Sequence, residues 1–307
     1  MAFEKASRRR AKLRMALTGV SGAGKTLGAL LIAYGITGDW DKIALIDTEH
    51  ERARFYANRD DFQIGEFLYC PMTAPFSPDR YKKLVREGAD AVGPDGVVIV
   101  DSLTHAWNAE GGVLEIKDKI AAQQGKNSYT AWSEAGREQS SLINTILAVN
   151  CHTICTMRSK MEYALEMNDR GKQQPVKLGL APVQRDDTEY EFDIVLDIAR
   201  SHIATASKDT TFLDRFGEII TPELGKKLRA WLDSGTEPPP APTCSVCGHD
   251  IAPSRERHTP PAEVAAQTEK LTGISMCEDC FIAWNKARRE AEKAAAAAQS
   301  AQEGVAS

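Results

Sequence analysis

The sequence has no run of about 18 uncharged apolar residues, the length that a membrane-spanning helix needs. It also has no apolar stretch behind its basic first residues, so we expect neither a secretory signal nor a membrane partner. Basic residues are in deficit, because 38 Lys and Arg face 43 Asp and Glu, a net charge of −5. A basic field over the whole surface is therefore excluded, and nucleic acid would have to be held by local patches.

The rest of the composition is ordinary for a soluble, cytoplasmic protein. The 307 residues are 42% hydrophobic and 26% charged, enough for one large α/β domain or two smaller domains. Two segments depart from the average. Residues 1–14 carry six basic side chains and one acid, and four of the seven cysteines form two C-x-x-C pairs between 244 and 280.

Between 13 and 233, strand-like apolar runs alternate with helical patterns, the order typical of a mainly parallel α/β sheet flanked by helices. We expect strands at residues 13–18, 43–47, 97–101, 152–157 and 192–199, and helices at 26–34, 81–92, 133–149 and 221–232. The expected parts are a basic arm (1–14), a core (15–234), a Pro-rich linker (235–243), a cysteine module (244–281) and an Ala-rich helical or disordered tail (282–307).

A glycine-rich loop follows the first expected strand. Residues 19–26, GVSGAGKT, match G-x-x-x-x-G-K-[ST] between a strand and a helix. Glycines let backbone N–H groups surround phosphate oxygens, and the next helix directs its N-terminus at the same charge. Lys25 is expected to reach the β- and γ-phosphates of ATP, and Thr26 to ligate Mg²⁺. The predicted nucleotide-binding residues of this loop are Gly19, Val20, Ser21, Gly22, Ala23, Gly24, Lys25, Thr26 and Leu27.

Two further expected strands end in acidic residues. The run 97–101, VVIVD, predicts a buried strand that brings Asp101 to the same Mg²⁺, directly or through water; the alternative is that Asp101 caps the next element. The run 43–50, IALIDTEH, ends in an acidic turn. Its Glu49 is the candidate to orient and polarise the attacking water, and a surface turn is the alternative.

The three motifs resemble the ATPase core of RecA-type recombinases. The segments KASRRRAKLRMALTG, APVQRDDTEYEFDIVLDI and ASKDTTFLDRFGEIIT are similar to RecA-like P-loop ATPases of bacteriophages, a group that includes single-strand annealing and recombination proteins. This resemblance, over about residues 10–200, implies a RecA-like fold and ATP hydrolysis in which Glu49 activates water. It also implies single-stranded DNA as a partner, a homo-oligomeric ring or filament, a single-strand DNA-binding protein as a further partner, and a bacterial host cytoplasm for a phage-encoded chain.

The resemblance assigns roles to three further basic residues. Lys208 lies in the region where the family has lysines that reach the γ-phosphate of a neighbouring subunit, which implies a catalytic finger acting in trans. Arg185 is the rival finger, and structural ion pairs are the alternative for both. Arg158 stands where RecA has a glutamine that senses the γ-phosphate, so Arg158 or Thr156 would take that role.

The segment after the 152–157 strand predicts a hairpin with its turn at 168–171, at the place where RecA-like proteins hold DNA. Basic groups near Tyr163 suit phosphate contact and base stacking, and a solvated hairpin is the alternative. Segment 103–132 corresponds to the family's first DNA loop, in which Trp107 is a stacking platform or a core residue. The basic residues 8–10 either follow phosphates or form a solvated arm. The predicted DNA-binding residues are Arg158, Lys160, Arg170, Lys172 and Lys177.

The paired cysteines predict a structural zinc site. Each C-x-x-C turn presents two thiolates, and two turns complete a closed tetrahedral shell around Zn²⁺. His249 and His258 are alternative ligands. Residues 236–307 hold seven basic and ten acidic side chains, which does not favour nucleic-acid binding by this module. The predicted ligands are Cys244, Cys247, Cys277 and Cys280.

These features predict a Mg²⁺-dependent, DNA-stimulated ATPase that acts on single-stranded DNA in phage recombination, annealing or replication. One alternative is an ATP-switched annealing protein with little turnover. Another is a helicase-loader or packaging ATPase that acts on protein partners. A P-loop nucleotide kinase is the third alternative, although the sequence shows no clear arginine-bearing lid.

Overall fold

The computed structural model describes residues 5–167, 173–237, 242–251, 253–254, 259 and 261–303, with backbone alone at 161–167, 173–180 and 294–303. The chain forms two compact units that meet in sequence at Glu237 and Pro238, inside the segment expected to be a linker. Within the described residues, no helix combines the length and apolar character needed to cross a membrane.

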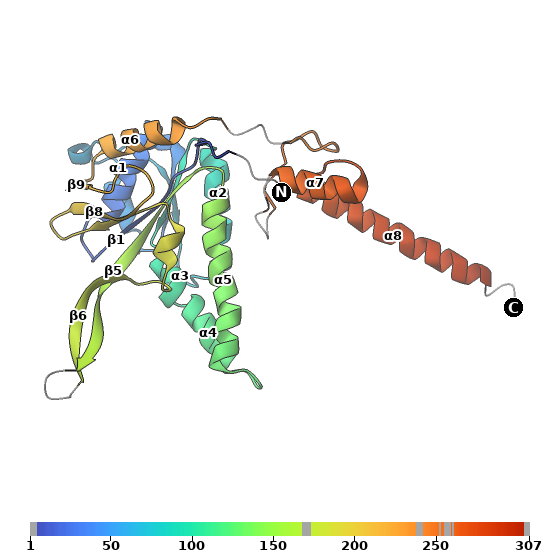
Figure 1. The fold of residues 1–307 in the computed structure, drawn as a ribbon, viewed down its shortest axis with the longest axis horizontal. Helices are drawn as coiled ribbons and strands as arrows, with labels where there is room; N and C mark the ends of the chain where they lie inside the picture. Colours follow the sequence, from blue (N-terminus) through green and yellow to red (C-terminus); the bar gives the residue numbers. More distant parts are fainter. Residues whose placement is uncertain are drawn as a thin grey trace. The chain divides into compact units, whose positions relative to one another are not determined.

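The first unit is built on a sheet with the strand order β3-β2-β4-β5-β1-β7-β8-β9, and β6 pairs with the outer part of β5 (Figure 1). The strands from β3 to β7 in this order run parallel, whereas β8 and β9 are antiparallel. The strands are β1 (Arg14–Gly19), β2 (Ile43–Asp47), β3 (Leu68–Pro71), β4 (Val97–Asp101), β5 (His152–Met167), β6 (Gln173–Pro182), β7 (Ile194–Ile198), β8 (Ile203–Asp209) and β9 (Gly217–Ile219).

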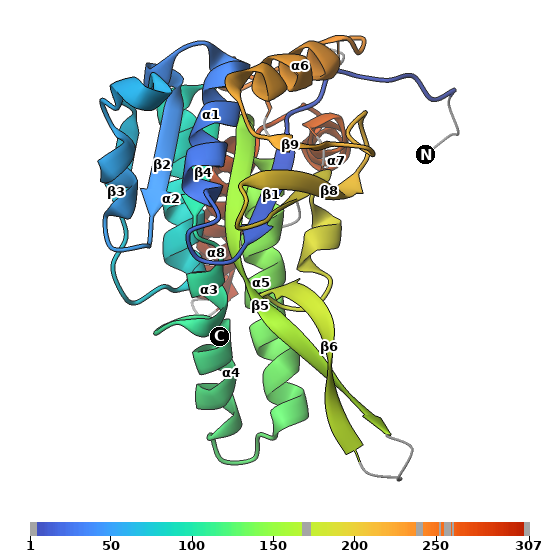
Figure 2. The same ribbon diagram turned by 90° about the vertical axis from the view of Figure 1, so that its left-hand side faces the viewer.

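Helices cover both faces of this sheet (Figure 2). Apolar residues of α1 and α6 form one buried cluster with the sheet, and those of α2, α3 and α5 form a second. The helices of the unit are α1 (Lys25–Thr37), α2 (Pro78–Val92), α3 (Thr104–Asn108), α4 (Val113–Ala121), α5 (Ser128–Ala148) and α6 (Pro222–Asp233), with 3₁₀ turns η1 (Trp40–Lys42), η2 (Arg52–Tyr56), η3 (Asp60–Phe62) and η4 (Thr188–Glu191).

Glycines set the close contact between α1 and α6. A Cβ atom added to Gly35 would lie 2.0 Å from the carbonyl oxygen of Pro222, and one added to Gly225 would lie 2.2 Å from that of Ile32. The two backbones can approach this closely only because both positions lack a side chain. This contact holds α6 against α1, the helix that follows the glycine-rich loop.

The sheet confirms the expected α/β class, since all five strands foreseen from apolar runs are present as β1, β2, β4, β5 and β7. Segment 103–132, which corresponds to the family's first DNA loop, contains α3, α4 and the start of α5, which pack on one another, and its contact with DNA stays a prediction. The Trp107 ring stacks on Trp132 with ring centroids 6.0 Å apart.

The described part of the basic arm contacts residues at and beyond the end of α6, and its contact with phosphates stays a prediction. The Arg10 N–H donates to the Thr236 carbonyl at 2.9 Å, and the Arg8 guanidinium lies 4.4 Å from the centre of the Trp231 ring. Arg10 also forms an ion pair with Glu237 at 3.0 Å. The arm is therefore tied down beyond the end of α6, because its cations have local aromatic and acidic partners.

The second unit contains α7 (Pro261–Thr272) and α8 (Glu278–Glu303) beside two cysteine turns. Its small buried cluster contains Cys244, Ile251, Val264, Ala265 and Met276. The tail expected to be helical or disordered from residue 282 continues α8 as helix through residue 303.

Candidate functional site

The glycine-rich loop joins β1 to α1 at the carboxyl edge of the parallel strands. Gly22 and Gly24 adopt φ of +79° and +97°, which other residues rarely adopt, and Gly24 caps the N-terminus of α1. Nζ of Lys25 donates to the carbonyls of Gly19 at 2.9 Å and Val20 at 3.0 Å. Burial lowers the pKa of Lys25, against the opposing charges of Asp101 and Glu49. The loop and the helix N-terminus therefore form a cradle for an anion.

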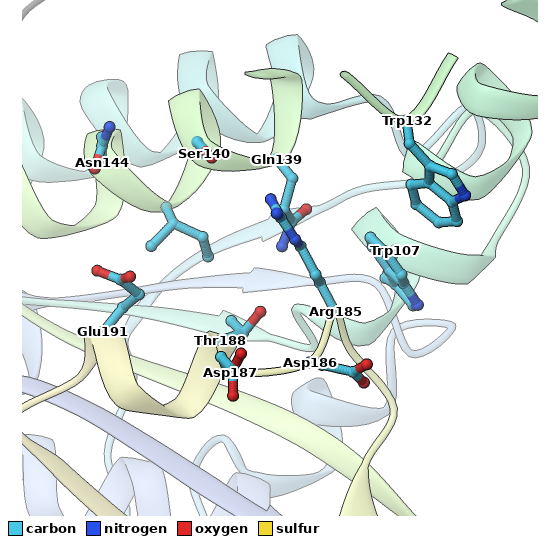
Figure 3. Close-up of a pocket in the computed structure, with 11 residues that line it drawn as sticks. Trp107, Trp132, Gln139, Ser140, Asn144, Arg185, Asp186, Asp187, Thr188 and Glu191 are labelled. Atoms are coloured by element: carbon cyan, nitrogen blue, oxygen red, sulfur yellow. The ribbon is translucent and has the colours of Figure 1, made fainter. Parts of the chain in front are cut away.

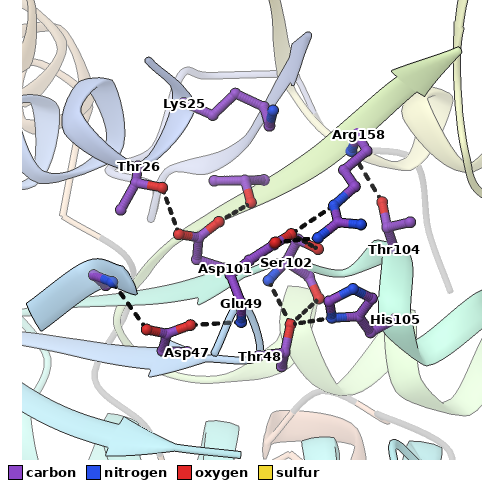
Figure 4. Close-up of polar contacts among 12 residues, drawn as sticks. Lys25, Thr26, Asp47, Thr48, Glu49, Asp101, Ser102, Thr104, His105 and Arg158 are labelled. Atoms are coloured by element: carbon purple, nitrogen blue, oxygen red, sulfur yellow. Dashed lines mark hydrogen bonds and ion pairs between the residues drawn. The ribbon is translucent and has the colours of Figure 1, made fainter. Parts of the chain in front are cut away.

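Asp101 ends β4 directly beside this cradle (Figure 4). Thr26 Oγ1 donates to one carboxylate oxygen of Asp101 at 2.6 Å, and the Thr156 hydroxyl donates to the other. Burial raises the pKa of Asp101, while these two hydroxyls act in the opposite direction. A hydroxyl and a carboxylate at this distance are oxygen donors of the kind that Mg²⁺ prefers, so Thr26 and Asp101 fit a magnesium ion.

Glu49 lies on a turn that Asp47 holds in place. One carboxylate oxygen of Asp47 accepts from the Glu49 N–H at 2.6 Å, and the other accepts from the Ala53 N–H at 3.0 Å. The Ser102 hydroxyl donates to Glu49 Oε1 at 3.1 Å. The turn after β2 therefore places Glu49 beside the cradle, and Ser102, directly after the end of β4, contacts its carboxylate.

Arg158 closes this arrangement from β5. Its Nε donates to Glu49 Oε1 at 2.7 Å, and a terminal nitrogen forms an ion pair with Glu49 Oε2. Burial raises the pKa of Glu49, but the hydrogen bonds and charge of Arg158 outweigh it and lower the pKa overall. In this structure the guanidinium of Arg158 is therefore engaged by a carboxylate of the nucleotide site, and its contact with DNA stays a prediction.

His105 lies behind the ion pair. Its Nδ1 is 2.7 Å from Thr48 Oγ1, which also accepts from the Ser102 N–H at 2.9 Å. Burial lowers the pKa of His105, although Glu49 partly counteracts it. The imidazole is therefore expected to be neutral near pH 7. It then braces the Glu49 turn without a charge of its own.

The cradle opens into a cavity of about 370 Å³ that is also lined by Glu49, Asp101 and Arg158. A second cavity of about 390 Å³ shares the loop glycines, Tyr56 and Arg59 with it and is otherwise largely apolar. A polar cavity next to an apolar one suits a nucleotide, with phosphates in the first and the base in the second. Residues of this apolar part that sequence analysis missed include Tyr56, Arg59, Phe62, His202 and Ile220.

A sequence signal for part of this set was available. Residues 51–62, ERARFYANRDDF, are rich in arginine and aromatic residues and follow the acidic turn directly. The Arg59 guanidinium lies 4.8 Å from the Phe62 ring centre and 5.7 Å from that of Tyr56. The signal from 198–220 was weaker, because those residues reach the loop only through the pairing of β7 with β1.

The two candidates for a trans-acting finger lie outside the cavity at the glycine-rich loop. Lys208 is opposite Val195 in the pairing of β7 with β8, and its Nζ donates to the Tyr190 carbonyl. Arg185 lines a different cavity beside α5. Neither residue completes the nucleotide site of its own chain, so action on a neighbouring subunit stays a prediction.

The remaining DNA candidates belong to the extension of β5 and to β6. Lys160 is exposed. Lys177 is in β6, where the backbone register places it opposite Tyr163. Arg170 and Lys172 lie outside the described residues. Antiparallel pairing of β5 and β6 gives the hairpin that the sequence predicted, while contact with DNA stays a prediction.

The four cysteines of the second unit come together. All four Sγ atoms lie within 4.8 Å of one another, and those of Cys247 and Cys277 are 3.8 Å apart. Four thiolates at about 2.3 Å from a tetrahedral Zn²⁺ would be separated by about 3.8 Å, so the cluster fits such an ion. His249 is not part of the cluster, and His258 lies outside the described residues.

Comparison with known proteins places this site in a family. No curated protein matches the chain. Residues 11–227, which span the sheet and the nucleotide site, match the AAA domain family. The chain belongs to this family of AAA-type P-loop ATPases.

Proposed function

We propose that the chain is a Mg²⁺-dependent ATPase that acts on single-stranded DNA, and that Arg158 restrains hydrolysis until DNA engages the β5–β6 hairpin. The observation that carries this proposal is the ion pair between Arg158 and Glu49 beside the phosphate cradle. It joins the residue best placed to activate water to the strand that leads to the hairpin. RecA-like action in phage recombination or annealing is the corresponding biological role.

The chemistry follows from the positions of four side chains. Lys25 leaves the Gly19 and Val20 carbonyls and binds the terminal phosphates, and the loop N–H groups also donate hydrogen bonds to the oxygens of these phosphates. Thr26 and Asp101 would hold Mg²⁺, which supplies positive charge to the phosphates. Glu49, which is ionised near pH 7, accepts a proton from the attacking water.

Arg158 opposes the last of these steps. Its two nitrogens engage both oxygens of the Glu49 carboxylate, which leaves that group a weaker base and a poorer acceptor for water. Arg158 is also the residue after which β5 leaves β1 and begins to pair with β6. A ligand that moves the hairpin would therefore disturb the ion pair directly.

Glu49→Gln tests the catalytic role. The amide cannot take the proton, so we expect phosphate release to fall about 10²- to 10⁴-fold while ATP binding persists. Phosphate release should be measured without DNA, with single-stranded DNA and with duplex DNA. Glu51→Gln is the matched control, since Glu51 lies in the same turn but is exposed and pairs with Arg54. Equal hydrolysis by Glu49→Gln and the wild type would remove Glu49 from the mechanism.

An ATP-switched annealing protein with little turnover is the second candidate. The same ion pair favours it, because a carboxylate that stays engaged after ATP binds would not activate water. Turnover number separates the two functions. Hydrolysis that single-stranded DNA does not accelerate, together with ATP-dependent annealing that survives in Glu49→Gln, would favour the switch over the motor.

A further inference from the structure

A cavity of about 750 Å³ lies outside the nucleotide site, between α5, α3 and the segment 185–191 (Figure 3). The stacked rings of Trp107 and Trp132 close one end of it, and Asn144 and Glu191 lie toward the other. A cavity of this size can accept a short peptide segment or a small molecule. Among the described residues, its lining includes no residue of the nucleotide site or of the β5–β6 hairpin.

Gln139, which lines this cavity, has a buried hydrogen-bond acceptor without a partner. Its side chain is 2% exposed, and its Oε1 has no hydrogen-bond partner among the described residues. The amide orientation is fixed by its neighbours. Gln184 accepts from the Arg185 N–H at 3.0 Å and donates to the Leu103 carbonyl at 3.1 Å, so it offers Oε1 to Gln139 Nε2 at 2.9 Å. A ligand with an N–H donor would satisfy the remaining oxygen.

The charges around the cavity favour a cation. The carboxylates of Asp186, Asp187 and Glu191 line it, and within the described residues their side chains form no hydrogen bond or ion pair. Arg185 is the one cationic lining residue, and its guanidinium lies against α5, 3.5 Å from where a Cβ of Gly136 would be. Three acids and one base give a net lining charge of −2, which opposes phosphate.

The aromatic end of the cavity has the same preference. Lys117 Nζ already lies 5.4 Å from the centre of the Trp132 ring, so this tryptophan pair accepts a cation in the free protein. Indole faces attract ammonium and guanidinium groups, most strongly where water is excluded. Aromatic faces, carboxylates and an unpaired carbonyl oxygen are together complementary to an arginine or lysine side chain.

We infer that this cavity binds a basic peptide segment of a protein partner. An arginine or lysine of that segment lies against Trp107, donates to Gln139 Oε1 and is balanced by the carboxylates of segment 185–191. The Gln139–Gln184 hydrogen bond continues to the carbonyl of Leu103, which directly follows Ser102 of the nucleotide site. The bound peptide would thus be connected through Gln139, Gln184 and Leu103 to Ser102, whose hydroxyl contacts Glu49.

Tryptophan fluorescence of the full-length protein tests this binding. The probe is the peptide acetyl-Gly-Arg-Arg-Gly-amide, and the comparison ligands are acetyl-Gly-Glu-Glu-Gly-amide and oligo(dT). We expect a saturable change with the basic peptide alone, and a smaller signal in Trp107→Phe because that ring reports the contact. Gln139→Leu should weaken binding, and a triple variant should weaken it about tenfold by removing charge. The triple variant is Asp186→Asn, Asp187→Asn and Glu191→Gln.

A second triple variant controls for net charge by removing three exposed carboxylates of α2, outside the cavity. It consists of Asp79→Asn, Glu87→Gln and Asp90→Asn. If the two triple variants weaken peptide binding equally, long-range charge explains the loss of affinity, and the inference that the peptide binds in this cavity is overturned. Oligo(dT) that displaces the bound basic peptide, and whose own binding the cavity triple variant alters, would assign the cavity to nucleic acid instead, whereas oligo(dT) bound at the hairpin would leave the peptide signal unchanged. A titration with the basic peptide that shows no saturation would also overturn the inference. If Gln139→Leu does not fold, the cavity triple variant still decides the test, because it changes only exposed carboxylates.

Discussion

At the scale of single residues, Arg158 has two opposite possible effects on hydrolysis, and one substitution separates them. If the ion pair restrains Glu49, Arg158→Met should raise DNA-free ATP hydrolysis about tenfold, because a free carboxylate is the better proton acceptor. Steady-state phosphate release measures this. Lys160→Met, an exposed change two residues further along β5, is the control. If Arg158→Met lowers the rate of hydrolysis and Lys160→Met does not, Arg158 instead contacts the γ-phosphate.

The same substitution has a pH signature. Arg158 lowers the pKa of Glu49 below its ordinary value, so the wild-type carboxylate stays ionised to lower pH. Removal of Arg158 raises that pKa, and the acid limb of the single-turnover rate should move to higher pH. An unchanged acid limb would show that another group controls it.

His152 predicts a separate dependence of stability on pH. Its Nδ1 accepts from the Leu13 N–H at 3.0 Å, and burial together with Lys12, Arg229 and Arg14 lowers its pKa to about 3. Because the folded-state pKa lies below the unfolded value, this contribution is complete above about pH 6.5 and is lost as the pH falls toward 3.

His152→Asn keeps an acceptor but removes the titration. We expect the free energy of unfolding of the wild type to fall by about 3 kcal/mol more than that of the variant between about pH 6.5 and pH 4. Urea unfolding at several pH values measures this difference. His50→Asn is the control, because His50 is exposed in a left-handed turn that asparagine tolerates. Parallel pH curves for His152→Asn and wild type would contradict the prediction.

Residues close in sequence were easier to foresee than residues brought together by folding. The loop 19–26 predicted its own role, because its spacing encodes the cradle. Asp101 was foreseen because it ends an apolar strand. The hydrogen bond between Glu49 and Arg158 was not foreseen, because it joins positions 109 residues apart and depends on where β2 and β5 lie in the sheet.

At the scale of elements, apolar runs predicted the buried strands but not the helices over segment 103–132. That segment is a chain of short pieces, α3, α4 and the start of α5, whose polar surfaces dilute the periodic signal. The contact between α1 and α6 was also hidden, because a glycine in a helix pattern carries no sign of what approaches it.

The contact between α1 and α6 predicts that even a methyl group added at its glycines lowers the stability of the fold. Gly35→Ala or Gly225→Ala would bring a methyl group against backbone of the facing helix, so we expect a loss of about 1–3 kcal/mol in the free energy of unfolding. Thermal or urea unfolding gives the value. Gly217→Ala is the control, since a Cβ there meets nothing within 4 Å. Unchanged stability in both helix variants would show that α6 moves away at little cost.

At the scale of the whole molecule, two units predict two separate responses to metal removal. The second unit has a small core, and a structural metal commonly supplies most of the folding free energy of such a unit. Chelation should therefore unfold residues 242–303 and leave the unfolding transition of the first unit in place. Circular dichroism, limited proteolysis and zinc content, expected to be about one ion per chain, measure the three parts of this prediction.

Cys277→Ser should reproduce the effect of chelation because it removes one thiolate from the cluster. Cys70→Ser is the matched control, since Cys70 lies on β3 in the first unit and is not one of the clustered cysteines. A second unit that keeps its helical signal after complete loss of zinc would show that its core suffices without metal.

The course of β5 has a mechanical consequence. Up to Arg158 the strand β5 is paired in register with β1, and β4 lies along its other edge as far as Cys155. From Ser159 on, the backbone pairing of β5 among the described residues is with β6 alone. A load on the hairpin cannot slide the locked part without breaking several ladder bonds at once. Bending of β5 is therefore expected at Arg158 and Ser159, so that the hairpin would pivot about Arg158 as a rigid arm.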